Sequence, residues 1–183
     1  MYNTFAGLQC AGSTATLNLT TSALKFTAFS DANGGGGNLA DDTYNAGDAS
    51  IKPDKTNNQV ECGIGTYKAI IGVHGSGASI VQVTAKLRKN SNAIAGCTGK
   101  ATFAAASVKG QLCLVCVFTI TAADLATAIG AATAVQTFAD PTSAFAGKGG
   151  APYNLVPVDF TLTGDASVTL TVDEAQFVVE RIR

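Results

Sequence analysis

Period-two alternation of apolar and polar residues recurs along most of this chain, and it constrains the fold more than any other feature. Residues 81–88 read VQVTAKLR, and residues 158–163 and 168–173 repeat the pattern. A shift by one residue would move each apolar set from the core into water, so the register of such strands is strongly specified. The sequence therefore predicts antiparallel strands with one buried and one solvated face.

Two longer segments each combine a pair of these patterns around a turn signal. Residues 65–94 contain Gly75-Ser76-Gly77, and residues 158–182 contain Gly164-Asp165. Glycine pairs and Gly-Asp steps between apolar runs are typical of turns, so we expect each segment to be an antiparallel β-hairpin. The fold class that follows is all-β: a single domain over residues 1–183, built as a two-sheet antiparallel jelly-roll sandwich.

Three stretches lack the alternation. Residues 31–48 contain four consecutive glycines, and residues 139–157 contain three of the four prolines. Both predict long surface loops. Residues 122–134 are rich in Ala and Thr and predict at most one short helix, which would begin after a cap at Thr121.

Charge and hydropathy argue against nucleic-acid and membrane partners. The chain has 12 basic and 13 acidic residues and a net charge of −1, without a basic patch or tail. Nonspecific nucleic-acid binding needs clustered Lys and Arg. The longest apolar run, residues 112–118, is far shorter than a membrane span. The N-terminus lacks the basic and apolar regions of a secretory signal, so we expect synthesis in the cytoplasm.

Cysteine usage predicts reduced thiols. There are five cysteines, an odd number that a disulfide framework would not use completely. Cys113 and Cys116 have the spacing of a redox or zinc half-site. In a strand, however, residues three apart lie on opposite faces, so we expect neither a redox nor a metal role for this pair.

The sequence predicts no catalytic residue, no cofactor site and no metal site, and we expect the protein not to be an enzyme. His74 is the single histidine, at the end of a strand, with no nucleophile or carboxylate partner in a recognisable motif. Asp31, Asp41, Asp42 and Asp48 carry oxygens of the kind Ca²⁺ prefers. Their spacing fits no EF-hand, and Ca²⁺ binding by this loop stays open.

Four motifs, in this order, resemble those of C1q/TNF-like jelly rolls. Gly65-Thr66-Tyr67 opens a strand, and Leu87-Arg88-Lys89-Asn90 closes the next one. Gly164-Asp165 forms a later turn, and residues 175–182 form the closing strand. The resemblance covers about residues 60–182. It implies a homotrimer whose threefold axis is lined by one sheet of the sandwich.

A C1q/TNF-like module with this Ala-, Thr- and Gly-rich, Trp-free composition resembles structural proteins of bacteriophage particles. We expect a trimeric capsid decoration (cement) or head-fibre protein on the virion surface, with the major capsid protein or another virion protein as its partner. The alternative is the receptor- or glycan-binding tip of a phage fibre. Exposed aromatic residues would favour that alternative, and the loops offer Tyr44, Phe138, Phe145 and Tyr153.

The composition also indicates a surface covered by partners. Apolar residues make up 46% of the chain and charged residues 14%, whereas about 25% charged residues are typical of soluble domains. A monomer of this composition would expose large apolar patches. We expect the trimer interface to include segments 110–120 and 175–182, which carry apolar residues on both strand faces. The individual candidates are Phe177, Val178, Val179 and Ile182.

Overall fold

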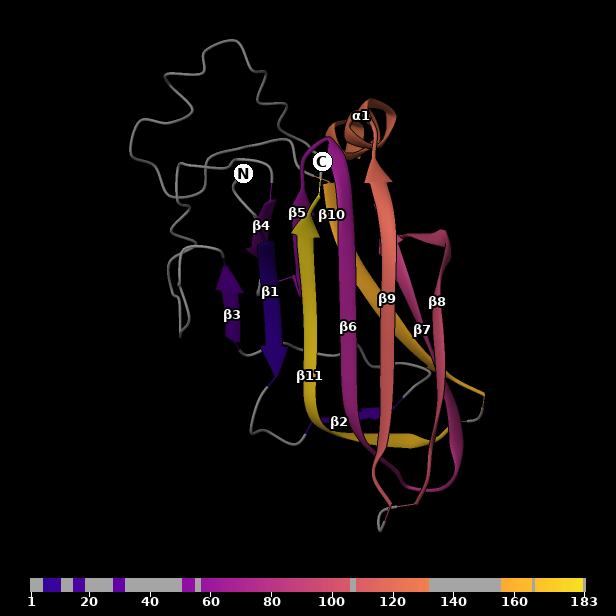
Figure 1. The fold of residues 1–183 in the computed structure, drawn as a ribbon. Coiled ribbons are helices and arrows are strands. Elements are labelled where there is room, and N and C mark those ends of the chain that lie inside the picture. The colour runs from indigo at the N-terminus through magenta and orange to yellow at the C-terminus, as the bar shows by residue number, and fades with distance from the viewer. Residues whose placement is uncertain are drawn as a thin grey trace.

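The computed structural model describes residues 5–10, 15–18, 28–31, 51–54, 57–105, 108–131, 156–165 and 167–182. These residues form two antiparallel β-sheets and one short helix, and the sheets pack face to face (Figure 1). The predicted two-sheet antiparallel sandwich is therefore confirmed. The connections between strands follow a jelly-roll-like path, because most neighbours in each sheet are distant in the sequence.

Sheet A has six strands within the described ranges, in the order β3-β1-β11-β6-β9, with β2 paired to β11. The strands of sheet A are β1 (Phe5–Cys10), β2 (Ala15–Asn18), β3 (Ala28–Asp31), β6 (Gly65–Gly77), β9 (Gly110–Ile120) and β11 (Thr169–Arg181). The long strands β11, β6 and β9 form its centre and one edge.

Sheet B has five strands within the described ranges, in the order β4-β5-β10-β7-β8. The strands of sheet B are β4 (Ile51–Asp54), β5 (Gln59–Cys62), β7 (Val81–Lys89), β8 (Asn92–Phe103) and β10 (Val156–Gly164). Alternation along β7 places Val81, Val83, Ala85 and Leu87 in the core, as the sequence predicts.

The prediction that residues 65–94 and 158–182 are hairpins is wrong. β6 lies in sheet A and β7 in sheet B, and the chain likewise crosses from β10 in sheet B to β11 in sheet A. Each turn therefore joins the two layers. Alternation shows only that one face of a strand is buried. Two consecutive strands have one buried face each whether they pair in one sheet or face each other in two packed sheets, so alternation cannot tell a hairpin from a crossing between sheets.

Backbone hydrogen bonds hold both of these corners. At the end of β6, Gly77 N donates to Ala104 O and Ala78 N donates to Thr169 O, each at 2.9 Å. After β10, Asp165 N donates to Gln82 O at 3.0 Å, and the Asp165 carboxylate accepts from Gln82 N at 2.9 Å. Gly77 thus bonds to a residue that follows β8 of sheet B, whereas the bonds between Asp165 and Gln82 continue the pairing of β10 with β7 inside sheet B.

The true hairpin of this region joins β7 to β8. Lys89 pairs with Asn92, so the loop consists of Asn90 and Ser91 alone. Both have positive φ angles, 46° and 64°, as the tight two-residue turns of hairpins require. Beyond this turn the register of β7 and β8 shifts between Lys86 and Arg88. A β-bulge of this kind accommodates the extra residues of β8, and residues 96–99 lie within this strand.

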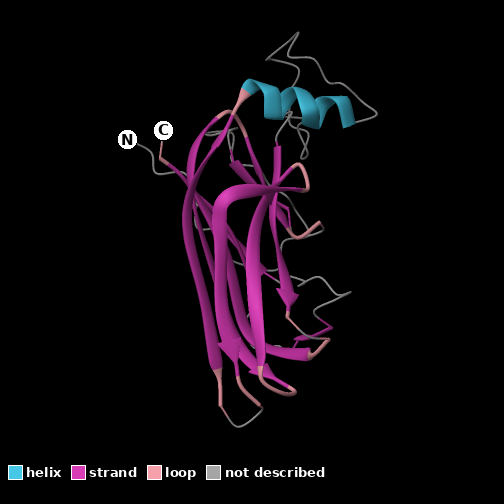
Figure 2. Ribbon diagram, turned by 90° about the vertical axis from the view of Figure 1, so that its right-hand side faces the viewer, coloured by secondary structure: helices cyan, strands magenta, loops and turns pink. Residues whose placement is uncertain are grey.

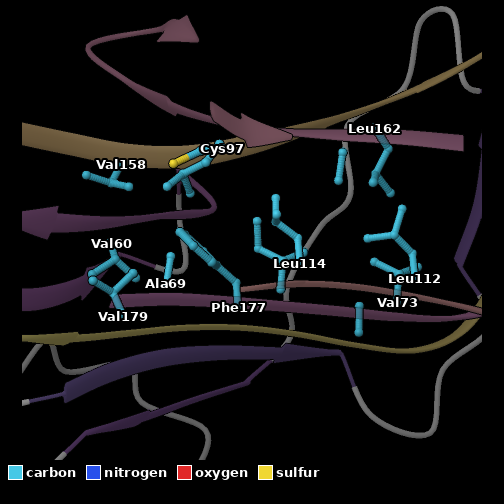
Figure 3. Packing of buried hydrophobic residues seen from close by; sticks show 14 of the residues in the cluster. Val60, Ala69, Val73, Cys97, Leu112, Leu114, Val158, Leu162, Phe177 and Val179 are labelled. Carbon is cyan, nitrogen blue, oxygen red and sulfur yellow. The ribbon is translucent and has the colours of Figure 1, made fainter. Parts of the chain in front are cut away.

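The core fills the space between the two sheets (Figure 3). Both sheets contribute, and the largest fully buried side chains among the described residues are Tyr67, Phe103, Phe177, Ile71, Leu87, Leu112, Ile120 and Leu170. Burying one large apolar side chain contributes about 1.5–3 kcal/mol, so this layer is the main source of stability.

The helix α1 (Ala122–Ala131) lies across one end of the sandwich (Figure 2). Thr121 caps it as predicted: Thr121 Oγ1 accepts from Asp124 N at 3.3 Å, and the Asp124 carboxylate accepts from Thr121 N at 2.8 Å. Such a reciprocal capping box satisfies the free donors at a helix start. Leu125 and Ala128 pack against the core.

The predicted loops fall mostly outside the described residues. Residues 32–48 and 139–155 belong to those undescribed parts. Asp31 ends β3, and Pro157 lies within β10, so the second predicted loop extends two residues too far. The prediction of one domain over residues 1–183 includes undescribed segments and stays a prediction.

Candidate functional site

The outer face of β9 carries exposed apolar side chains. Leu112, Leu114 and Phe118 point into the core, whereas Val115 and Val117 point outward and are 57% and 59% exposed. We expected both faces of this apolar run to be buried. Within one subunit, only the inner face is. Two valines exposed to this extent on a long, regular strand leave an apolar surface uncovered.

The outward side chains of β9, β6 and β11 form an apolar row. Val115 is the register partner of Ile70, Ile70 is the partner of Val178, and Val178 is the partner of Gly7 on β1. Directly paired residues of antiparallel strands lie on the same face with their Cβ atoms about 4.5–5.5 Å apart. We call Val115, Ile70 and Val178, together with the adjacent Val117, the sheet A patch.

The rows beside the sheet A patch are polar but electrically balanced. On one side, Val117 of the patch is followed across the sheet by Lys68 and then Glu180, and the Lys68 ammonium forms an ion pair with the Glu180 carboxylate. On the other side, Cys113 is followed across the sheet by Gly72 and then Gln176. These rows bring no uncompensated charge, so covering the patch would not desolvate an unpaired ion.

Two of the four predicted interface residues are placed wrongly. Phe177 and Val179 are fully buried in the core of the subunit and cannot contact a neighbour. Successive residues of a strand point to opposite faces, so Val178 between them points outward and is half-buried. Ile182 is 47% exposed, and its N–H donates to Thr66 O at 2.8 Å.

Sequence reasoning did not name Val115, Val117 and Ile70 as interface residues. The signal was present, because a continuous apolar run in a strand places apolar residues on both faces. In the sequence nothing shows which face the second sheet covers. The burial of Leu112 and Leu114 decides this and leaves Val115 and Val117 outside.

Cys113 and Cys116 lie on opposite faces of β9, as predicted. Cys113 is exposed, and Cys116 is partly buried against the core. The structure describes the thiols of Cys62, Cys97, Cys113 and Cys116, and all four are free. The side chain of Cys10 lies outside the description.

His74 has a carboxylate neighbour that sequence reasoning missed. Its Nδ1 lies 3.8 Å from Asp173 Oδ2, and Lys109 Nζ contacts the same oxygen. Asp173 sits where the register of β6 and β11 shifts, between Val172 and Glu174, and alternation does not reveal such a bulge. In the part of the chain that the structure describes, no nucleophilic side chain is recorded against His74, so we assign this cluster no chemistry.

Within the described ranges, no three His, Cys, Asp or Glu side chains gather closely enough to hold a metal ion. Asp41, Asp42 and Asp48 of the predicted acidic loop lie outside those ranges. In the part of the chain that the structure describes, no helix is both long and apolar enough to cross a membrane.

No family model matches the chain, and no curated protein matches its sequence.

Proposed function

We propose that this protein is a structural protein of a bacteriophage virion, a homotrimeric capsid decoration (cement) or head-fibre protein with a C1q/TNF-like jelly roll. The observation that carries the proposal is the sheet A patch. It places Val115, Ile70 and Val178 in one row across three neighbouring strands, with Val115 57% exposed. An apolar surface of this kind marks an interaction site.

The motif that opens the resemblance has a structural role that supports it. In Gly65-Thr66-Tyr67, the Tyr67 ring is fully buried and stacks on Phe118 with ring centroids 5.6 Å apart. Its hydroxyl donates to Gly63 O at 2.9 Å. Tyr67 therefore ties the start of β6 to β9, the strand whose outer face carries Val115 and Val117.

A second copy of this chain is the partner that best fits the sheet A patch. The patch is aliphatic and is bordered by the internally neutralised pair Lys68–Glu180, so an identical surface can cover it without like-charge repulsion. Obligate interfaces between identical subunits are more apolar than the average surface and bury on the order of 2,000 Å² or more. We expect a trimer closed through sheet A to form an interface of this kind.

No observation favours the alternative of a receptor- or glycan-binding tip. Among the described residues, the exposed large apolar side chains are all aliphatic: Ile64, Ile80, Val108, Val115, Val117 and Ile182. The aromatic residues that would support the alternative, Tyr44, Phe138, Phe145 and Tyr153, lie outside the described residues. The absence of enzymatic activity stays a prediction.

A cryo-EM map of the particle encoded with this chain tests the proposal. We expect threefold-symmetric density on the outer shell into which three copies of the sandwich fit, with sheet A facing the axis. Absence of the chain from purified particles, established by mass spectrometry, would overturn the virion role. Density that fits the chain only as single copies would overturn the trimer.

A further inference from the structure

The edge strands of the two sheets, β8 and β9, run beside each other in antiparallel fashion. A Cβ atom built on Gly110 of β9 would lie 3.1 Å from Cα of Phe103 on β8. A Cβ atom built on Gly99 of β8 would lie 3.1 Å from Cβ of Leu114 on β9. Gly99 lies four residues before Phe103 on β8, and Leu114 lies four residues after Gly110 on β9. Both contacts therefore fit one antiparallel register of the two strands.

The same register brings two thiols together. Cys97 lies two residues before Gly99 on β8, and Cys116 lies two residues after Leu114 on β9. The same register therefore places Cys97 opposite Cys116. Both side chains point inward: Cys97 is 3% exposed, and Cys116 packs partly buried against the core. The two thiols share a hydrogen bond, and Cys97 Sγ lies 4.0 Å from Val117 O. Figure 3 shows the Cys97 sulfur among apolar side chains between the sheets.

We propose that Cys97 and Cys116 are an oxidation site at which hydrogen peroxide forms a disulfide that joins sheet B to sheet A. A disulfide needs Cβ atoms about 3.5–4.5 Å apart, and the neighbouring pair Gly99 and Leu114 shows that β8 and β9 approach this closely. The bond would link the two sheets at an edge where no backbone ladder between β8 and β9 is recorded among the described residues.

The reaction consumes one peroxide and releases two waters. The thiolate of Cys116, the more accessible of the two, attacks one peroxide oxygen and breaks the O–O bond, which gives a sulfenic acid and, after protonation, water. The sulfur of Cys97 then attacks the sulfenic sulfur of Cys116 and displaces hydroxide. The Cys97 proton and this hydroxide form the second water. The two thiols supply two electrons, and the peroxide accepts them.

The surroundings make this oxidation slow near neutral pH. Burial, with the hydrogen bond to Cys97 adding to it, raises the pKa of Cys116 to about 12. The thiolate is the reacting form of cysteine, and only a small fraction is present at neutral pH. The pair therefore stays reduced in a reducing compartment, which agrees with the expectation of five free thiols, and closes only under sustained oxidation.

The experiment treats the full-length protein with hydrogen peroxide and measures its intact mass without reductant. We expect a monomeric product in which Cys97 and Cys116 have together lost two hydrogen atoms, beside oxygen added at the exposed Cys113. Tryptic mapping should find the peptide 90–100, which carries Cys97, bound to the peptide 110–148. Because the second peptide contains both Cys113 and Cys116, the same map of a Cys113→Ser variant assigns the partner: the cross-link persists if the partner is Cys116.

Matched variants and melting curves complete the test. Cys97→Ala and Cys116→Ala should each abolish the cross-link, whereas Cys113→Ser should leave it. The cross-link closes a loop of about 20 residues and should raise the Tm of the wild-type protein by roughly 5–10 °C. A cross-link through Cys113, sulfinic or sulfonic acids at Cys97 and Cys116 in place of the bond, or free Cys97 and Cys116 after prolonged treatment with excess peroxide would each overturn the proposal.

Discussion

Val115 on the edge strand β9 lies directly opposite Ile70 on β6, and both side chains point away from the core of the sandwich. Ile70 in turn lies opposite Val178 on β11. Three aliphatic side chains in one row are not needed to stabilise the subunit itself, because the inner face of the same strands already supplies the core. Their position is explained if another copy of the chain covers them.

Replacing Val115 by Asp should dissociate the trimer into folded monomers. Burying an unpaired carboxylate in an apolar interface costs several kcal/mol, whereas in the monomer this side chain is exposed. Sedimentation velocity at micromolar concentration measures the oligomeric state, and circular dichroism checks the fold. The control is Thr102→Asp on the exposed face of β8, which should remain trimeric. A trimeric Val115→Asp variant would exclude Val115 from the interface.

Replacing Phe177 by Ala should lower the free energy of unfolding by about 3–5 kcal/mol. Phe177 is fully buried, and its ring meets that of Phe160 edge-on with centroids 5.4 Å apart. The loss comes from a cavity inside the subunit and should appear in the unfolding of the Val115→Asp monomer as well. Urea denaturation measures it. A change below about 1 kcal/mol in that monomer would contradict the placement of Phe177 in the core.

Gly75→Ala should destabilise the fold by about 1–3 kcal/mol or more. A Cβ atom at this position would lie 2.1 Å from the backbone oxygen of Thr171, and a backbone atom cannot move aside without disturbing the β6–β11 ladder. Gly72→Ala is the matched control, since its Cβ would meet only the flexible side chain of Gln176 at 3.1 Å. Melting curves compare the two, and equal Tm values would contradict the close approach.

Acid should weaken the attachment of α1 through Asp124. Partial burial raises the pKa of this carboxyl group, but hydrogen bonds from Lys89 and Thr121 outweigh burial and hold the pKa below its ordinary value. Lys89 Nζ lies 2.8 Å from Asp124 Oδ2. A carboxyl group with a lowered folded-state pKa contributes its full stabilisation above the unfolded-state pKa, about 3.9, and loses it as the pH falls through the folded-state value.

The variant Asp124→Asn should therefore be less stable than wild type at neutral pH and lose less stability below about pH 4. Urea titrations at neutral and acidic pH give the two free energies of unfolding. The control Asp165→Asn removes a carboxylate from the other end of the sandwich, where the Gln82 N–H is its partner. The same acid dependence in Asp124→Asn as in wild type would show that this ion pair does not stabilise the fold.

The fold class follows from local pattern, and the pairing of strands does not. Alternation and a cap at Thr121 predict strands and one short helix, because each depends on residues close together in the chain. The same alternation cannot distinguish a turn within one sheet from a corner between two. After Gly164, the backbone and carboxylate of Asp165 bond to Gln82, a residue far away in the sequence. The local pattern at Gly164-Asp165 does not show this partner.

The candidate site was predictable as a segment but not as residues. Segment 110–120 was expected to have a second apolar face, and Val115 and Val117 are that face. In the closing strand, the sequence offers Phe177, Val178 and Val179 as a continuous apolar stretch, and only the position of sheet B shows that Val178 alone points outward. Which face of a two-sided strand is buried depends on tertiary packing.

The central claim is that sheet A closes a homotrimer, and multi-angle light scattering of the purified full-length protein tests it most directly. We expect a single species with the mass of three chains at micromolar concentration, and the mass of one chain for the Val115→Asp variant. A wild-type protein with the mass of one or two chains at that concentration would contradict it.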